Sequence, residues 1–136
     1  MVIGIAEFLE KVSKLKTRQE KVEALKANDS FILRIILQGA FDPKVKFLLP
    51  EGNPPFRVTT LVDQENILIR EGRKIKYFVE GLYPDLKQNR RETMFIELLE
   101  AVAPRDADLL LAIKDKKLPF KGITADMVTE ALPGIF

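Results

Sequence analysis

The side chains in this 136-residue sequence whose spacing suits chemistry are basic ones placed where helices are expected to begin. A basic turn precedes the last expected helix and comprises Lys114, Lys116, Lys117, Lys121, Gly122 and Thr124. Lysines beside the free N–H groups of a helix start favour an anion, because cation, amide donors and helix dipole act together. Lys87, Arg90 and Arg91 precede another expected helix start. The pattern predicts phosphate binding at both places.

Another basic group lies in the middle of the chain and is opposed only by Glu71. It consists of Arg70, Arg73, Lys74 and Lys76. Of the aromatic residues, only Tyr77 and Phe78 interleave with the basic groups, so the sequence gives weak support to stacking of single-stranded bases. Charge groups of this kind are also typical of solvated helix faces. The net charge of +2 does not decide between the two interpretations.

The side chains that carry much enzyme chemistry are missing, since the chain has no Cys, His or Trp. Thiol nucleophiles, cysteine-rich zinc sites and Ser-His-Asp triads are therefore excluded. The seven glycines are too widely separated to form a phosphate loop. Asp106 and Asp108 are better explained as partners of helix N–H groups than as a catalytic pair. We expect no enzyme, no catalytic residues, no cofactor and no metal.

Apolar residues recur at helical spacing along most of the chain, and capping residues mark where helices begin. The first helix is expected from Ile5, Thr17 opens a second with a capping box, and Ser30 precedes a third. Residues 31–37 are apolar at almost every position, which suits either a buried helix or a central strand. The length of the element and its helical neighbours favour a helix.

The second half of the chain is expected to add helices that begin at Asp63, Asn89, Pro104 and Thr124. The helix from Asp63 would turn positions as far as Leu82 inward, although Gly72 weakens it and residues 67–69 could form a strand. Pro104 suits the first turn of a helix.

Residues 44–62 cannot form a regular helix, because three prolines and a glycine fall within residues 50–55. Residues 47–49 are too apolar for a free linker, so an extended loop attached to the domain is expected. The predicted fold class is all-α, with residues 1–136 forming a single compact domain of about six to seven helices and one long Pro-rich loop.

Neither a membrane span nor a signal peptide is indicated. The sequence has no apolar run of the length a span needs, and its first residues lack a basic region followed by an apolar one. The expected location is the cytoplasm, or the cytoplasm of the host cell for a phage protein.

Both ends of the chain resemble the N-terminal helical DNA-binding domain of phage-type ATP-dependent DNA ligases. At the start, the resemblance rests on residues 17–28, the apolar residues 31–37, and Ala-Phe-Asp-Pro at 40–43. At the end, it rests on Ile-Lys-Asp-Lys-Lys-Leu at 113–118, Gly-Ile-Thr at 122–124 and Leu-Pro-Gly-Ile-Phe at 132–136. Residues 50–88 depart from the family. The chain also looks like uncharacterised small proteins of tailed phages.

The resemblance implies a free-standing relative of that domain, which grips duplex DNA by its phosphates and minor groove without reading sequence. The chain lacks the Lys-x-Asp-Gly motif of the ligases, so it is not expected to be a ligase. The expected function is non-enzymatic, sequence-independent binding of double-stranded DNA, in an accessory role in phage replication or repair.

The alternative function is protein–protein interaction, with docking through the loop at residues 44–58. Exposed apolar residues bracketed by prolines would favour a partner such as a replication or transcription protein. Packing of this loop as a lid over the core is the simpler explanation.

Overall fold

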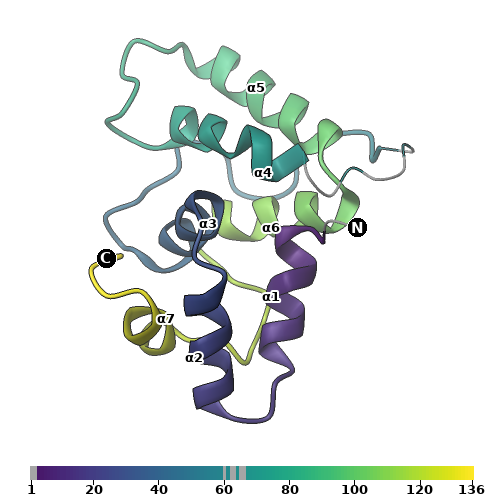
Figure 1. The fold of residues 1–136 in the computed structure, drawn as a ribbon. Helices are drawn as coiled ribbons and strands as arrows, with labels where there is room; N and C mark the ends of the chain where they lie inside the picture. Colours follow the sequence, from purple (N-terminus) through teal and green to yellow (C-terminus); the bar gives the residue numbers. More distant parts are fainter. Residues whose placement is uncertain (1–2, 60, 62–63, 65–66) are drawn as a thin grey trace.

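Seven α-helices and one 3₁₀ helix are the regular elements of the residues that this computed structural model describes, 3–59, 61, 64 and 67–136. In chain order they are α1 (Ile5–Ser13), α2 (Arg18–Ala27), α3 (Phe31–Phe41), α4 (Ile67–Glu71), η1 (Gly72–Phe78), α5 (Gln88–Ala101), α6 (Pro104–Lys114) and α7 (Ala125–Ala131). The predicted all-α fold class is confirmed (Figure 1). None of the helices in the described ranges has the length and apolar character that crossing a membrane requires.

Three of the predicted helix starts are closed by the expected side chains. The hydroxyl oxygens of Thr17, Ser30 and Thr124 accept hydrogen bonds from the backbone N–H three residues on, at 3.1, 3.2 and 3.3 Å. Each bond satisfies an N–H group that has no partner within its helix. The apolar run after Ser30 is therefore a helix, not a strand.

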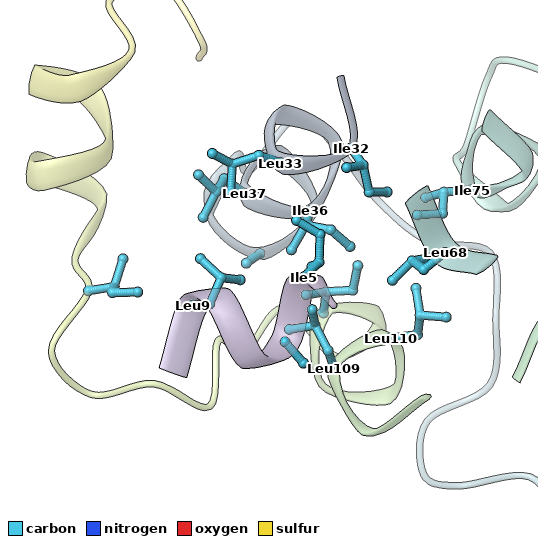
Figure 2. Packing of buried hydrophobic residues seen from close by; sticks show 14 of the residues in the cluster. Ile5, Leu9, Ile32, Leu33, Ile36, Leu37, Leu68, Ile75, Leu109 and Leu110 are labelled. Atoms are coloured by element: carbon cyan, nitrogen blue, oxygen red, sulfur yellow. The ribbon is translucent and has the colours of Figure 1, made fainter. Parts of the chain in front are cut away.

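Helix α3 lies at the centre of the fold and is buried on most sides. Figure 2 shows Ile36 of α3 among side chains of α1, α6 and α4, including Leu9, Leu109 and Leu68. All four of these side chains are 0–1% exposed. Helix α2 packs against α7 beside this core. Burying a side chain of this size contributes about 1.5–3 kcal/mol, so the near-continuous apolar run of α3 accounts for its central place.

The proline-rich loop is attached to the domain, as predicted. The Leu48 N–H donates to the Phe78 carbonyl at 2.8 Å, and the Glu80 N–H donates to the Lys46 carbonyl at 2.8 Å. These bonds form one isolated antiparallel bridge between Phe47 and Val79. The loop is therefore hydrogen-bonded to the end of η1 and to the residues directly after it.

The expectation of one continuous helix from Asp63 to Leu82 is wrong where the structure describes it. Asp63 lies outside the described residues. The helix tightens into the 3₁₀ helix at Gly72, where an added Cβ would come within 2.4 Å of the Ile32 side chain of α3. Leu82 is 55% exposed, because the chain has left the helix and turns at Gly81, whose φ is +91°.

The expected capping role of Asn89 is also wrong. Helix α5 begins one residue earlier, and its N-cap, Lys87, makes no side-chain capping bond. The Asn89 side chain instead accepts from the Arg90 N–H at 2.9 Å. Pro104 does occupy the first turn of α6, as expected.

Asp106 has a structural role. It is 1% exposed, and its Oδ1 accepts from the Ala6 N–H at 3.0 Å, at the start of α1. A carboxylate from α6 thus supplies the anion at a helix start whose own N-cap is glycine.

Candidate nucleic-acid interface

Two lysines of the predicted basic turn are held by contacts inside the protein. The ammonium of Lys114, whose side chain is 2% exposed, donates to the Pro50 carbonyl at 2.9 Å and to Asp115 at 2.7 Å. The ammonium of Lys116 donates to the carbonyls of Gly39, Asp42 and Val45 at 2.5, 2.8 and 2.8 Å. These contacts occupy the donors that were expected to bind phosphate.

Lys116 lies beside backbone carbonyls at the end of α3 and in the loop that follows. Helix α3 ends at Phe41, so carbonyls of its last turn have no N–H partner further along the helix. The loop that follows contributes another carbonyl, and the Lys116 ammonium serves all three of its acceptors. Its backbone has a φ of +61°, the left-handed conformation. Burial lowers the pKa of Lys116 below its ordinary 10.5, and the Asp42 carboxylate opposes this shift only in part.

Arg91 is likewise engaged, and is 4% exposed. Its Nε donates to the Tyr77 carbonyl at 2.9 Å and its Nη2 to the Tyr83 carbonyl at 3.0 Å, while Nη1 donates to the Gln88 side chain at 2.7 Å. The guanidinium therefore ties the first turn of α5 to both sides of the turn that follows η1.

The other four predicted cations are exposed. They are Lys87, Arg90, Lys117 and Lys121. Arg90 lies 3.5 Å from Glu97. Helix α5 lies at the top of the view in Figure 1, whereas the segment between α6 and α7 runs through its lower half. Lys114, at the start of the basic turn, nevertheless lines one hollow with Glu92 and Phe95 of α5.

Gly122 and Thr124 have local structural roles. The Gly122 carbonyl accepts from the Lys21 ammonium at 3.0 Å, and an added Cβ at Gly122 would come within 2.5 Å of the Ser13 carbonyl oxygen. Thr124 caps α7, which has only seven residues. Contacts within the protein therefore take up much of this turn. Lys117 and Lys121 are exposed, and phosphate binding at this turn stays a prediction.

The third basic group does form a continuous site. A surface hollow of about 380 Å³, here called the η1 hollow, is lined by Arg70, Glu71, Arg73, Lys74, Lys76, Tyr77 and Tyr83. Its volume lies within the range of about 300–1,000 Å³ that is usual for ligand sites. The hollow combines cations, which attract phosphates, with aromatic rings, which stack on bases.

The four cations of the η1 hollow are exposed. Lys74 pairs with Glu71 at 3.0 Å. Among the described residues, no ion pair joins Arg70, Arg73 or Lys76 to a carboxylate.

Tyr83 is the member of this site that the sequence does not indicate. It lies seven residues after the last basic residue of the group, beyond the turn at Gly81, and its ring reaches Tyr77 with a centroid distance of 4.5 Å. A signal is present in the composition, because Tyr77 and Tyr83 are the only two tyrosines in the chain.

The proline-rich loop offers less apolar surface than its sequence suggests. Its residues Phe47, Leu49 and Phe56 are partly buried against the core, whereas Val58 is 54% exposed. A small hollow of about 220 Å³ lies between this loop and α5, with Phe95 and Ile96 in its wall. Docking of a protein partner at residues 44–58 stays a prediction.

No group of three or more acidic side chains is placed to hold a metal ion in the part of the chain that the structure describes. Cationic side chains and two aromatic rings are the chemistry that the η1 hollow offers.

These features define a small all-α protein with a basic, tyrosine-lined surface hollow. The chain belongs to a family of unknown function, DUF6433, whose sequence profile matches residues 8–119. That match includes every residue of the η1 hollow. No curated protein and no solved structure matches the chain, so the resemblance to ligase DNA-binding domains stays a prediction from the sequence.

Proposed function

We propose that this chain is a non-enzymatic protein that binds double-stranded DNA through its phosphates without reading sequence. An accessory role in phage DNA replication or repair is the part of this proposal that rests on the ligase resemblance. The η1 hollow is the proposed contact surface, in place of the basic turn between α6 and α7.

The observation that carries the proposal is the concentration of charge. The residues of the η1 hollow carry four cations and one carboxylate, a formal charge of +3, whereas the whole chain carries +2. All other residues together are therefore slightly acidic. A local positive potential on a nearly neutral protein directs an anionic polymer to one face.

The exposure and the ion pairing of these cations support the same function. Arg70, Arg73 and Lys76 are exposed and have no carboxylate partner in the described part of the chain. Each can neutralise a phosphate and release a condensed counterion, which is the main source of sequence-independent affinity for DNA. Lys114, Lys116 and Arg91 lack that freedom.

The test compares two pairs of charge reversals by fluorescence anisotropy with a short labelled duplex. One pair is Arg73→Glu with Lys76→Glu in the η1 hollow. The matched control pair is Lys117→Glu with Lys121→Glu in the predicted basic turn, which makes the same change in net charge at exposed positions. Binding is measured at about 50 mM salt, where phosphate contacts contribute most.

We expect the wild type to bind the duplex, the first pair to weaken binding by about tenfold or more, and the control pair to weaken it by at most about threefold. A larger loss in the control pair would place the interface at the basic turn. Absence of any binding by the wild type at this salt concentration would overturn the proposed function.

A further inference from the structure

The η1 hollow contains an aromatic pair that duplex binding does not use. The rings of Tyr77 and Tyr83 have centroids 4.5 Å apart and are tilted by 48°. Tyr83 is 40% exposed, so part of its ring is open to solvent. Both tyrosines line the hollow together with the cations.

Arg91 joins the backbone of the two tyrosines by hydrogen bonds. Its buried guanidinium donates to the backbone carbonyls of both tyrosines, at 2.9 Å to Tyr77 and 3.0 Å to Tyr83. The planar fork of an arginine fixes the direction of both hydrogen bonds. The two rings are therefore presented by an ordered backbone, which lowers the entropy that a ligand must overcome to stack on them.

A third ring borders the same cations. Phe31, at the start of α3, is 49% exposed. The guanidinium of Arg73 lies 5.8 Å from its centroid and the ammonium of Lys76 lies 5.2 Å from it. Cation–π attraction orients these two side chains over an exposed ring. Phe31 thus adds an exposed ring beside two of the cations that line the η1 hollow.

We infer that the η1 hollow takes unpaired nucleotides, with a base stacked on the exposed Tyr83 ring and its phosphates on Arg73 and Lys76. This inference rests on the proposed function and adds unpaired nucleotides as a second DNA form that the same site takes. The faces of paired bases are covered inside a duplex, so aromatic rings in a cationic groove serve only unpaired bases. An unpaired stretch next to duplex DNA would use both the cations and the tyrosine rings of the η1 hollow.

The composition of the chain provides a direct probe of this site. It has two tyrosines and no tryptophan, so intrinsic fluorescence comes from Tyr77 and Tyr83 alone. Stacking of a base on a tyrosine quenches its emission. The full chain is titrated with a single-stranded oligodeoxynucleotide that cannot pair with itself, and with the blunt duplex of the same length, after correction for DNA absorbance.

Three single variants divide the contributions in an anisotropy assay with the same two probes. Tyr83→Ala removes the ring, and Tyr83→Phe keeps it. Leu82→Ala is the matched control, because Leu82 is exposed beside Tyr83 but does not line the hollow.

We expect the single strand to quench tyrosine emission and the blunt duplex to leave it nearly unchanged. Tyr83→Ala should weaken single-strand binding by about tenfold and change duplex binding by less than about twofold, while Tyr83→Phe and Leu82→Ala bind both probes like the wild type.

The inference is overturned if Tyr83→Ala leaves single-strand affinity unchanged, or lowers both affinities equally. If the reversal of Arg73 and Lys76 still weakens duplex binding in that case, the proposed function stands and only the preference for unpaired bases fails. If neither probe binds the wild type, both proposals fail.

Discussion

The end of α6 and the 3₁₀ helix η1 are both rich in basic residues, but the two regions use their cations in opposite ways. At the end of α6, the ammonium groups of Lys114 and Lys116 donate to four backbone carbonyls within the protein. Around η1, three of the four cations that line the hollow have no carboxylate partner among the described residues.

The difference lies in what surrounds each cluster. Lys116 lies beside the end of α3 and the start of the proline-rich loop, where a helix end exposes backbone carbonyls. An ammonium group with three donors satisfies several of them at once. Arg73 and Lys76 of η1 lie over the Phe31 ring, which attracts them without taking up their hydrogen-bond donors. Lys116 also lies over a ring, at 5.8 Å from the Phe47 centroid, but its donors are taken by carbonyls.

The largest effect is expected from removing the ammonium group of Lys116, which tests its structural role. Lys116→Met should lower the free energy of unfolding by about 3 kcal/mol, because hydrogen bonds to a charged group contribute about 1.5–3 kcal/mol and the variant removes three of them. Urea unfolding measures the change. The control is Lys117→Met at the exposed neighbouring position, which should stay within about 0.5 kcal/mol of the wild type. Equal stability of the two variants would contradict the assignment.

A smaller loss of stability is expected for Arg91→Lys, at about 2 kcal/mol. A lysine keeps the charge but cannot make the three divergent hydrogen bonds of the buried guanidinium. The same variant should lose the single-strand quenching of tyrosine emission, since the carbonyls of Tyr77 and Tyr83 are no longer held together. A variant that is destabilised but retains full quenching would show that Arg91 supports the fold alone.

Neutralising single cations of the η1 hollow tests whether each of them contacts DNA phosphate. Arg70→Ala and Arg73→Ala should each reduce the salt dependence of duplex binding, the slope of log K against log salt, by about one. Their stability should change by less than about 0.5 kcal/mol because both side chains are exposed. The measurement is a series of binding titrations between about 50 and 200 mM salt. A slope that stays constant would mean that neither side chain contacts phosphate.

The smallest effect concerns an exposed cation whose partner titrates. Arg34 donates two hydrogen bonds of 2.7 Å to Asp29, and these hold the pKa of Asp29 below its ordinary 3.8. A depressed carboxyl pKa in the folded state means that the stabilisation is present above pH 3.8 and is lost as the pH falls through the lowered value.

Melting curves of wild type and Asp29→Asn should therefore differ slightly at neutral pH and converge in acid. The carbonyls that bind Lys116 have no ionisable proton, so the effect of Lys116→Met should persist through the same acid range. A difference between wild type and Asp29→Asn that grows in acid would contradict the sign derived for this pair.

The fold could be predicted from the sequence wherever the signal is local. The caps at Thr17, Ser30 and Thr124 act on N–H groups three residues away, and the apolar run after Ser30 predicts a buried element by its composition alone. The change to a 3₁₀ helix at Gly72 depends on Ile32, forty residues earlier, and such an approach leaves no local pattern.

The candidate site could be predicted only in part for the same reason. The cluster at residues 70–76 is visible in the sequence, whereas its second tyrosine joins through the turn at Gly81. The roles of Lys114 and Lys116 depend on where the proline-rich loop folds back, and a charge pattern contains no information about unpaired carbonyls. Counting lysines thus identified a basic turn but not whether its donors are available.

The most direct measurement of the central claim is a map of backbone amide NMR shifts during titration of the full chain with duplex DNA. We predict that the largest shift changes fall in residues 70–91, around the η1 hollow and the start of α5, while the amide shifts of residues 114–124 stay nearly unchanged. Largest changes at residues 114–124 would contradict it and return the interface to the basic turn.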